Sequence, residues 1–274
     1  MNLHAIRLDA KQALRDSKRP ALYDTLIYVS ITALLPLILS VLYFLLDEAM
    51  VGTGGGLQAA KLRTTYDMVS SALYVLSTAV SVCTMFFTFG YNATMLLRIR
   101  RQKIDSKSIL IGFRLLLRVF SLTVLTWLYI MLWSCLFLIP GLIAAYRYRL
   151  AVFILIDNPT ILPSQALRAS SRLVRGYKGR LFALDLSFWY YYVLTAVAAV
   201  LTNIDAYNMM VELYELTELP LLSYEQTLGI YAAGILLVCA AQLWKLPHVT
   251  ASTAGFYQKL RLDAIARETP TDPM

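Results

Sequence analysis

Five long apolar runs set the limits on what this chain can fold into. They cover roughly residues 22–46, 68–97, 119–139, 181–202 and 228–246. A helix needs about 20 apolar residues to cross the ~30 Å hydrocarbon core of a bilayer. Of the 274 residues, 58% are hydrophobic and 15% are charged, whereas soluble domains carry about 25% charged residues. The chain is therefore expected to be an all-α, polytopic membrane protein.

The stretch Leu138–Pro159, LIPGLIAAYRYRLAVFILIDNP, decides how many times the chain crosses the membrane. If residues 119–156 formed one crossing, the basic segment 157–180 would lie outside, against the rule that short basic loops stay cytoplasmic. A turn at residues 139–141 removes this conflict. The return limb, residues 141–156, then covers about 24 Å at 1.5 Å per residue, so that it is either a thin full span or a deep re-entrant helix.

The distribution of Lys and Arg predicts six membrane segments, arranged as three hairpins with both termini cytoplasmic. Basic residues concentrate in residues 1–21, 98–118 and 157–180. By contrast, residues 202–225 contain no Lys or Arg, and residues 47–67 contain only Lys61 and Arg63. Since Lys and Arg are retained on the cytoplasmic side, the two poorly basic segments are expected to be external.

This topology gives one integral membrane domain over residues 1–274. The first apolar run is expected to be a retained span, because it is far longer than the 7–15 apolar residues of a signal peptide. The predicted parts are a cytoplasmic amphipathic helix (1–21), four membrane segments (22–156), a second cytoplasmic amphipathic helix (157–180), two spans (181–246) with an external loop (203–226), and a cytoplasmic tail (247–274).

A basic amphipathic stretch precedes each outward-going span and is expected to lie on the membrane interface. In the first stretch, one face carries the apolar side chains Leu3, Ile6, Ala10, Ala13 and Leu14, and the other carries Arg7, Lys11, Arg15 and Lys18. On an anionic cytoplasmic leaflet each Lys or Arg contributes about 1 kcal/mol to binding. In the segment 157–180 the expected contacts with lipid headgroups are Arg168, Arg172, Arg175, Lys178 and Arg180.

Four stretches along the chain carry a resemblance to a known family. They are IRLDAKQALRDSKRPAL, LIPGLIAAYRYRLAVFILIDNP, ALRASSRLVRGYKGRLFALDLSFWYY and AGFYQKL. Together they resemble the domain-of-unknown-function 975 family of bacterial, mostly Gram-positive, integral membrane proteins. The most specific part is DNP, followed at close spacing by AL, S, GYKGRLF and LDLSF, whereas the acidic stretch 202–225 lies outside the resemblance. The resemblance implies a polytopic helical fold in the bacterial cell (inner) membrane, and it brings no established activity.

Arg147 and Arg149 are the most informative polar residues within an apolar segment. At mid-depth each would cost about 2.5–3.5 kcal/mol, so that such residues usually face a bundle interior or a water-filled cavity. They could form an anion or lipid-headgroup site. We favour a structural role, in which they pair with carboxylates or carbonyls, or extend to the interface. Because they lie about 200° apart on a helix, we expect them not to share one ligand.

Asp185 is the expected partner of Arg149. It lies one turn into the span that begins near residue 181, and Asp24 has a similar position in the first span. An Arg149–Asp185 ion pair fits if the return limb runs antiparallel beside that span. The alternative places Asp185 at the interface, where it caps the backbone or contacts Arg180.

The residues that usually carry catalysis or bind metals are sparse and scattered. The histidines are His4 and His248, and the cysteines, which are expected to be small buried residues, are Cys83, Cys135 and Cys239. Their number is odd and no CxxC spacing occurs, so that neither a disulfide nor a metal site is predicted. We therefore expect a protein that is not an enzyme and has no cofactor.

Two functions remain compatible with the sequence. The leading expectation is a non-enzymatic protein that binds membrane lipids, on the anionic cytoplasmic leaflet, or a membrane-protein partner. The alternative is a small transporter or channel for an anionic substrate, with Arg147 and Arg149 lining the path. Nucleic acid is not an expected partner, because the basic residues flank apolar runs and do not form one stripe.

Overall fold

The computed structural model describes residues 2–17, 20–51, 57–103, 106–203 and 224–268, which form helices and no strand. The predicted all-α class is confirmed. In chain order the helices are α1 (Leu3–Asp16), α2 (Ala21–Val29), η1 (Ser30–Leu34), α3 (Leu35–Val51), α4 (Leu57–Ile99), η2 (Ser106–Leu110), α5 (Ile111–Arg114), α6 (Leu116–Leu136), α7 (Leu138–Tyr148), α8 (Ala151–Asp157), α9 (Pro163–Leu173), α10 (Lys178–Leu186), α11 (Trp189–Leu201) and α13 (Tyr224–Glu268).

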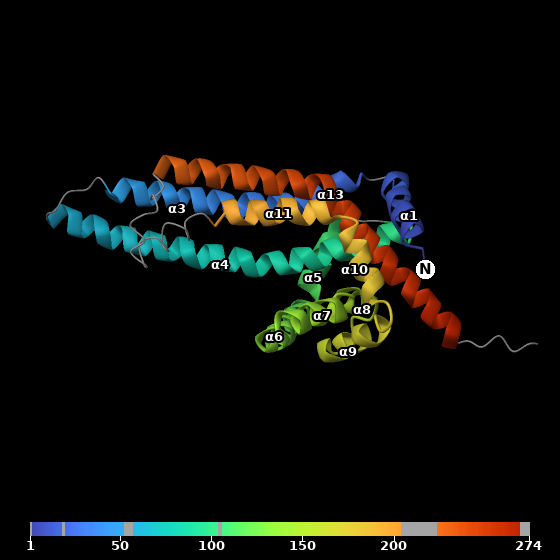
Figure 1. Cartoon of the computed structure of the whole chain (residues 1–274). Coiled ribbons are helices and arrows are strands. Elements are labelled where there is room, and N and C mark those ends of the chain that lie inside the picture. The colour runs from blue at the N-terminus through green and yellow to red at the C-terminus, as the bar shows by residue number, and fades with distance from the viewer. Residues whose placement is uncertain (1, 18–19, 52–56, 104–105, 204–223, 269–274) are drawn as a thin grey trace, which may run out of the picture.

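The helices form two groups that meet near α10 (Figure 1). In the first group, α3, α4, α11 and the N-terminal half of α13 run alongside one another, and α1 packs on α13 at one end of this bundle. In the second group, α6, α7, α8 and α9 lie together below α10. The main core contains side chains from both groups, including Phe89, Leu155, Leu184 and Phe256.

Five helices in the described part of the chain are long and apolar enough to cross a membrane. They are Ala21–Leu42, Arg63–Ile99, Leu116–Leu136, Leu138–Asp157 and Glu225–Arg267, and the bent pair α10–α11 makes a sixth if it counts as one. Only 11% of the apolar window in Leu116–Leu136 is buried inside the protein. Its side chains therefore present an apolar outer surface, as lipid-facing helices do.

The span predicted over residues 181–202 is interrupted by a 71° bend between α10 and α11. Two short-range contacts form the bend: the Phe188 amide donates to the Asp185 carbonyl at 2.8 Å, and the Ser187 hydroxyl donates to the Leu184 carbonyl at 2.6 Å. The side chain of Phe188 is buried. The burial of this ring offsets the loss of regular helical hydrogen bonds at the bend.

The break between α6 and α7 lies at Phe137, earlier than the turn predicted at residues 139–141. Phe137 has an extended backbone (φ −161°, ψ 151°) between α6 and α7. Pro140 lies in the first turn of α7, where its missing N–H costs no intrahelical bond. The candidate span that follows is the 20-residue segment Leu138–Asp157, which covers about 30 Å, whereas the predicted residues 141–156 cover about 24 Å.

Helix α13 continues well past residue 246, where the sequence predicted the end of the last span. Pro247 lies inside the helix, and Figure 1 shows the C-terminal half running at an angle to the first half. The segment predicted as a tail from residue 247 is packed: Val249, Ala254, Phe256 and Tyr257 are buried. A proline within a helix removes one hydrogen bond, and the contacts of these four side chains compensate for that loss.

The amphipathic helices place their apolar faces on protein. Helix α1 buries Ile6, Ala10, Ala13 and Leu14, and it packs on α4 and α13. Helix α9 is shorter than the predicted 157–180 segment and packs on α6 and α8. Their charged faces are still exposed, but these apolar faces are not free to enter a bilayer.

Two further predictions concern the burial of the cysteines and the external acidic loop. Cys83 and Cys135 are exposed, so that the prediction of buried cysteines is wrong for these two, and Cys239 is half-buried. Most of the acidic external loop predicted over 203–226 lies outside the described residues.

Candidate functional site

Three aspartates each pair with an arginine from a distant part of the chain. Their carboxylates have side-chain exposures of 5%, 3% and 9%, and the pairs are Asp24–Arg98, Asp157–Arg100 and Asp185–Arg149. A buried carboxylate without a partner is strongly destabilising, so that each pair fixes the helices that carry it. Within the described residues, no group of three or more His, Cys, Asp or Glu side chains could hold a metal ion.

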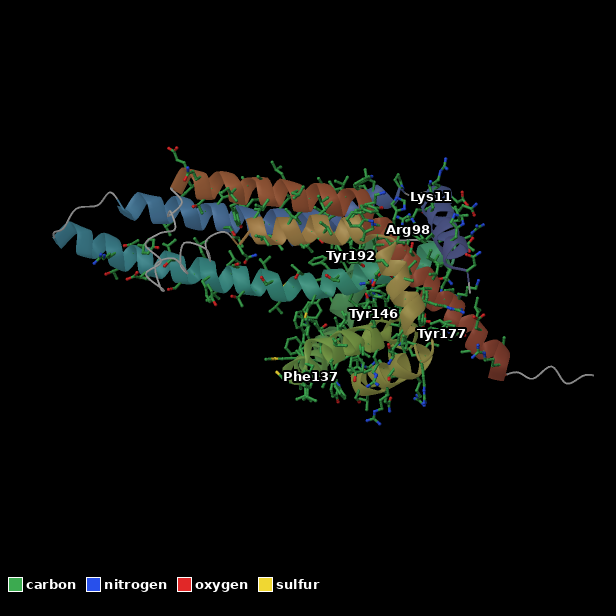
Figure 2. All side chains as sticks on the ribbon, viewed as in Figure 1. Lys11, Arg98, Phe137, Tyr146, Tyr177 and Tyr192 are labelled. Atoms are coloured by element: carbon green, nitrogen blue, oxygen red, sulfur yellow. The ribbon has the colours of Figure 1, made fainter. Side chains whose placement is uncertain are left out.

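The Arg149–Asp185 pair lies where α7, the α10–α11 bend and α13 meet. Arg149 follows the last residue of α7 and donates to Asp185. The carboxylate also accepts from the hydroxyls of Tyr146 at 2.9 Å and Tyr192 at 3.1 Å. These tyrosines come from α7 and α11 and are labelled in Figure 2. The second guanidinium nitrogen lies 3.5 Å from the Thr253 hydroxyl on α13, so that one network joins four helices.

The Asp157 pair is the most extensively bonded of the three. Arg100 binds both carboxylate oxygens, at 2.6 and 2.8 Å, and Arg261 contacts one of them at 2.8 Å. Tyr257 donates to the same carboxylate at 2.6 Å. The hydrogen bonds to Asp157 raise the pKa of Arg100 above its ordinary value. This cluster attaches the end of α8 to the end of α4 and to the C-terminal half of α13.

The Asp24–Arg98 pair joins the start of α2 to the end of α4. The Arg98 side chain is fully buried, and it also donates to the Ser17 hydroxyl at 2.7 Å and the Pro20 carbonyl at 3.4 Å.

Sequence reasoning assigned Arg98 and Arg100 to a basic cytoplasmic loop and did not find their partners. The signal that could have identified these partners is a lone aspartate near one end of an apolar run. Asp24, like Asp185, lies near the start of its run, and Asp157 directly follows residues 141–156.

A cleft of about 520 Å³ lies between α7 and the bent pair α10–α11. Among the described residues, the charged side chains that line it are Arg149 and Asp185. The rest of the lining is apolar or aromatic: Leu142, Ala145, Tyr146, Phe182, Leu186, Trp189, Tyr192 and Val193. Leu142, Leu186 and Trp189 are each more than half exposed, so that the rim of the cleft belongs to the outer apolar surface of the protein.

Arg147 does not share this site. It does not line the cleft, and its Nε atom is buried without a hydrogen-bond partner in the described part of the chain. Its carbonyl accepts from the Ser170 hydroxyl of α9 at 2.8 Å. The structure therefore separates the two arginines, which the helical spacing also suggested.

The five basic residues expected to contact lipid headgroups lie in and after α9. They are Arg168, Arg172, Arg175, Lys178 and Arg180. None of them forms an ion pair with a described residue. Lys178 is half-buried, and the other four are exposed. Arg180 lies over the Tyr177 ring, 5.6 Å from its centroid. These cations remain available to an external anionic surface.

Residues 135–264 match the family described as "Protein of unknown function (DUF975)". This match confirms the predicted resemblance for that part of the chain. It runs from the end of α6 into the C-terminal half of α13, and it includes Arg149, Asp157 and Asp185. No curated protein and no solved structure gives a significant match.

Proposed function

We propose that the chain is a multi-pass bacterial membrane protein that binds the acyl chain of a membrane lipid in the cleft between α7 and α10–α11. The observation that carries the proposal is the composition of that cleft. Apolar and aromatic side chains make up its lining apart from the Arg149–Asp185 pair, and its volume is about 520 Å³. Small-molecule sites of this kind usually have volumes of about 300–1,000 Å³ and a mostly apolar lining.

The position of the cleft also supports a lipid as the occupant. Its rim residues continue the exposed apolar surface of the candidate spans. In a bilayer such a cleft would be next to lipid chains and far from bulk water. An acyl chain could therefore enter it without first leaving the membrane.

We propose that both termini are cytoplasmic, and the aspartate pairs support the part of this arrangement that places the basic segments on one side. Asp24–Arg98 places the start of α2 beside the end of α4, and Arg100–Asp157 adds the end of α8. Arg261 adds the C-terminal half of α13 to this same cluster. The four segments proposed to be cytoplasmic are thus collected at one end. The exposed cations after Asp157 would then face anionic lipid headgroups.

An anion path through the protein is a second candidate, because Arg149 does line the cleft. The charge of Arg149 is matched by Asp185, and two tyrosine hydroxyls complete the network. Arg147 lies away from the cleft. The lining therefore favours an apolar occupant over a small anion.

Trp189 provides a direct test, because it lines the cleft and lipid chains brominated along their length quench tryptophan on contact. In a variant that keeps Trp189 and replaces Trp127, Trp133 and Trp244 with Phe, we expect quenching at low fractions of brominated lipid. The variant Ala145→Phe, which fills the cleft, should shift this curve to higher lipid fractions.

Two controls separate a site from general contact with surrounding lipid. A protein that keeps only Trp127, which is 71% exposed on α6 and outside the cleft, should follow the fraction of brominated lipid without saturation. The variant Ala196→Phe adds the same ring at an exposed position on α11 and should leave the Trp189 curve unchanged. The proposal fails if Trp189 and Trp127 give the same curve, or if Ala145→Phe has no effect.

A further inference from the structure

A second hollow, of about 420 Å³, lies between α1, the α10–α11 bend and α13. Its lining contains three Lys or Arg side chains, two histidines and no acidic residue. The full lining is His4, Arg7, Leu8, Lys11, Phe188, Tyr190, Lys245, His248 and Ser252. Figure 2 shows Lys11 on α1, at the end of the bundle opposite the start of α4.

The three Lys and Arg side chains of this hollow have no carboxylate partner among the described residues. The ion pairs among the described residues involve other arginines, and none includes Arg7, Lys11 or Lys245. This differs from the three buried aspartate pairs, where the protein neutralises each carboxylate itself. Cations that converge on one hollow repel one another, and that repulsion is relieved when an anion binds.

Aromatic rings hold two of these cations in place. The Arg7 guanidinium lies 5.1 Å from the centroid of the Phe188 ring. The Lys245 ammonium lies 4.2 Å from the centroid of the Trp244 ring and 5.4 Å from that of Tyr190. Cation–π contacts of this kind restrict a long side chain without neutralising it. Both cations are therefore oriented and still carry their full charge.

We propose that this hollow binds a phosphate group, either from the headgroup of an anionic phospholipid or from a soluble phosphate ester. Arg and Lys are the usual ligands of phosphate oxygens, Arg as a fork of donors and Lys as a point charge. The hydroxyls of Tyr190 and Ser252 and the imidazoles of His4 and His248 are further donors in the lining. The volume exceeds that of a phosphate ion and leaves room for a glycerol or similar group.

This site is distinct from the cleft of the proposed function. The aromatic residues at the α10–α11 bend line different sites. Phe188 and Tyr190 line the hollow, and Trp189 and Tyr192 line the cleft. The phosphate site does not depend on an acyl chain in the cleft. Either proposal can therefore fail without the other.

Binding to the detergent-purified full chain tests the phosphate site, by titration calorimetry with three probes. The probes are short-chain (dihexanoyl) phosphatidylglycerol, glycerol 3-phosphate and inorganic phosphate. The triple variant Arg7→Gln, Lys11→Gln, Lys245→Gln should weaken binding at least about tenfold, a change of about 1.4 kcal/mol. The single variant Lys245→Gln should give a smaller loss in the same direction.

A matched control removes three cations elsewhere. Arg15, Lys103 and Arg114 are exposed and do not line the hollow. Replacing them with Gln gives the same net charge, and binding should stay within about twofold of the wild type, or about 0.4 kcal/mol. Thermal unfolding of both triple variants, compared with the wild type, verifies that each is folded.

The three probes distinguish the sources of the phosphate. Binding of the short-chain lipid alone assigns the hollow to a lipid headgroup. Comparable binding of glycerol 3-phosphate assigns it to a soluble ester, and both results support the proposal. The proposal is overturned if no probe binds, or if the two triple variants weaken binding equally, since the effect would then reflect net charge alone.

Discussion

Arg149 and Asp185, which are 36 residues apart in the chain, form an ion pair that fixes the end of α7 against the bend between α10 and α11. Both partners are largely protected from solvent, with side-chain exposures of 27% and 9%. The pair also lines the cleft proposed to bind an acyl chain. Its loss should therefore affect both the stability of the protein and the shape of the cleft.

The variant Arg149→Ala should destabilise the protein by about 3–5 kcal/mol, because Asp185 would stay buried without its counter-charge. The double variant Arg149→Ala with Asp185→Ala should recover part of this loss. Thermal unfolding in detergent, analysed as a double-mutant cycle, measures the coupling between the two residues. Arg147→Ala is the matched control, because that side chain forms no ion pair within the described residues, and it should cost less. Strictly additive losses would reject the coupling.

The Asp157 cluster should respond unequally to the loss of its two arginines. Arg100→Gln removes a bidentate partner whose side chain is 18% exposed, whereas Arg261 is 40% exposed. An exposed pair usually contributes only about 0–1 kcal/mol, so that Arg261→Gln should be nearly neutral, and Arg100→Gln should lower the unfolding temperature clearly. Equal unfolding temperatures for the two variants would contradict this ranking.

Gly112 should not tolerate alanine, because α5 packs directly on the backbone of α4 at this position. A Cβ atom on Gly112 would lie 2.2 Å from the Phe86 carbonyl oxygen. Separating the two helices enough to admit it should cost about 1–3 kcal/mol in unfolding free energy. Gly229→Ala in α13 is the control, since its Cβ would meet no atom within 4 Å, and it should stabilise the helix by about 0.5–1 kcal/mol. A Gly112→Ala protein as stable as the control would show that the two helices can separate freely.

The proposed orientation of the chain predicts which positions an impermeant thiol reagent can reach in intact cells. In a background without Cys83, Cys135 and Cys239, Asn203→Cys should be labelled from outside. Thr160→Cys, which is also exposed on the protein, should be labelled only after the membrane is opened. Labelling at position 160 in intact cells would reverse the proposed return limb.

The sequence predicted the features that depend on local composition. Apolar runs longer than the bilayer core identified the membrane-length helices, and the depths of Arg149 and Asp185 suggested their pairing. Partners at helix ends were harder to identify: Arg98 and Arg100 sit in a basic stretch, where a buried guanidinium and a solvated one have the same sequence signal. Only their tertiary contacts, with Asp24 and Asp157 respectively, distinguish Arg98 and Arg100 from the solvated arginines nearby.

Two further features depend on packing that the sequence does not encode locally. The bend after Asp185 contains neither proline nor glycine, and it coincides with the burial of the Phe188 ring. In α13 the sequence suggested a break that the structure does not have. Pro247 predicted a helix end, but the helix continues through this residue. The local cost of a proline was smaller than the gain from burying residues such as Phe256.

The bend between α10 and α11 gives the two proposed sites a common mechanical element. Neighbouring residues Phe188 and Trp189 line the hollow and the cleft respectively, so that a change in the 71° angle would reshape both at once. If an occupant of one site favours a particular angle, it changes the affinity of the other site by some factor. Thermodynamic linkage then requires the same factor in the reverse direction. A headgroup or phosphate ester in the hollow would in this way control how tightly the cleft retains the proposed acyl chain.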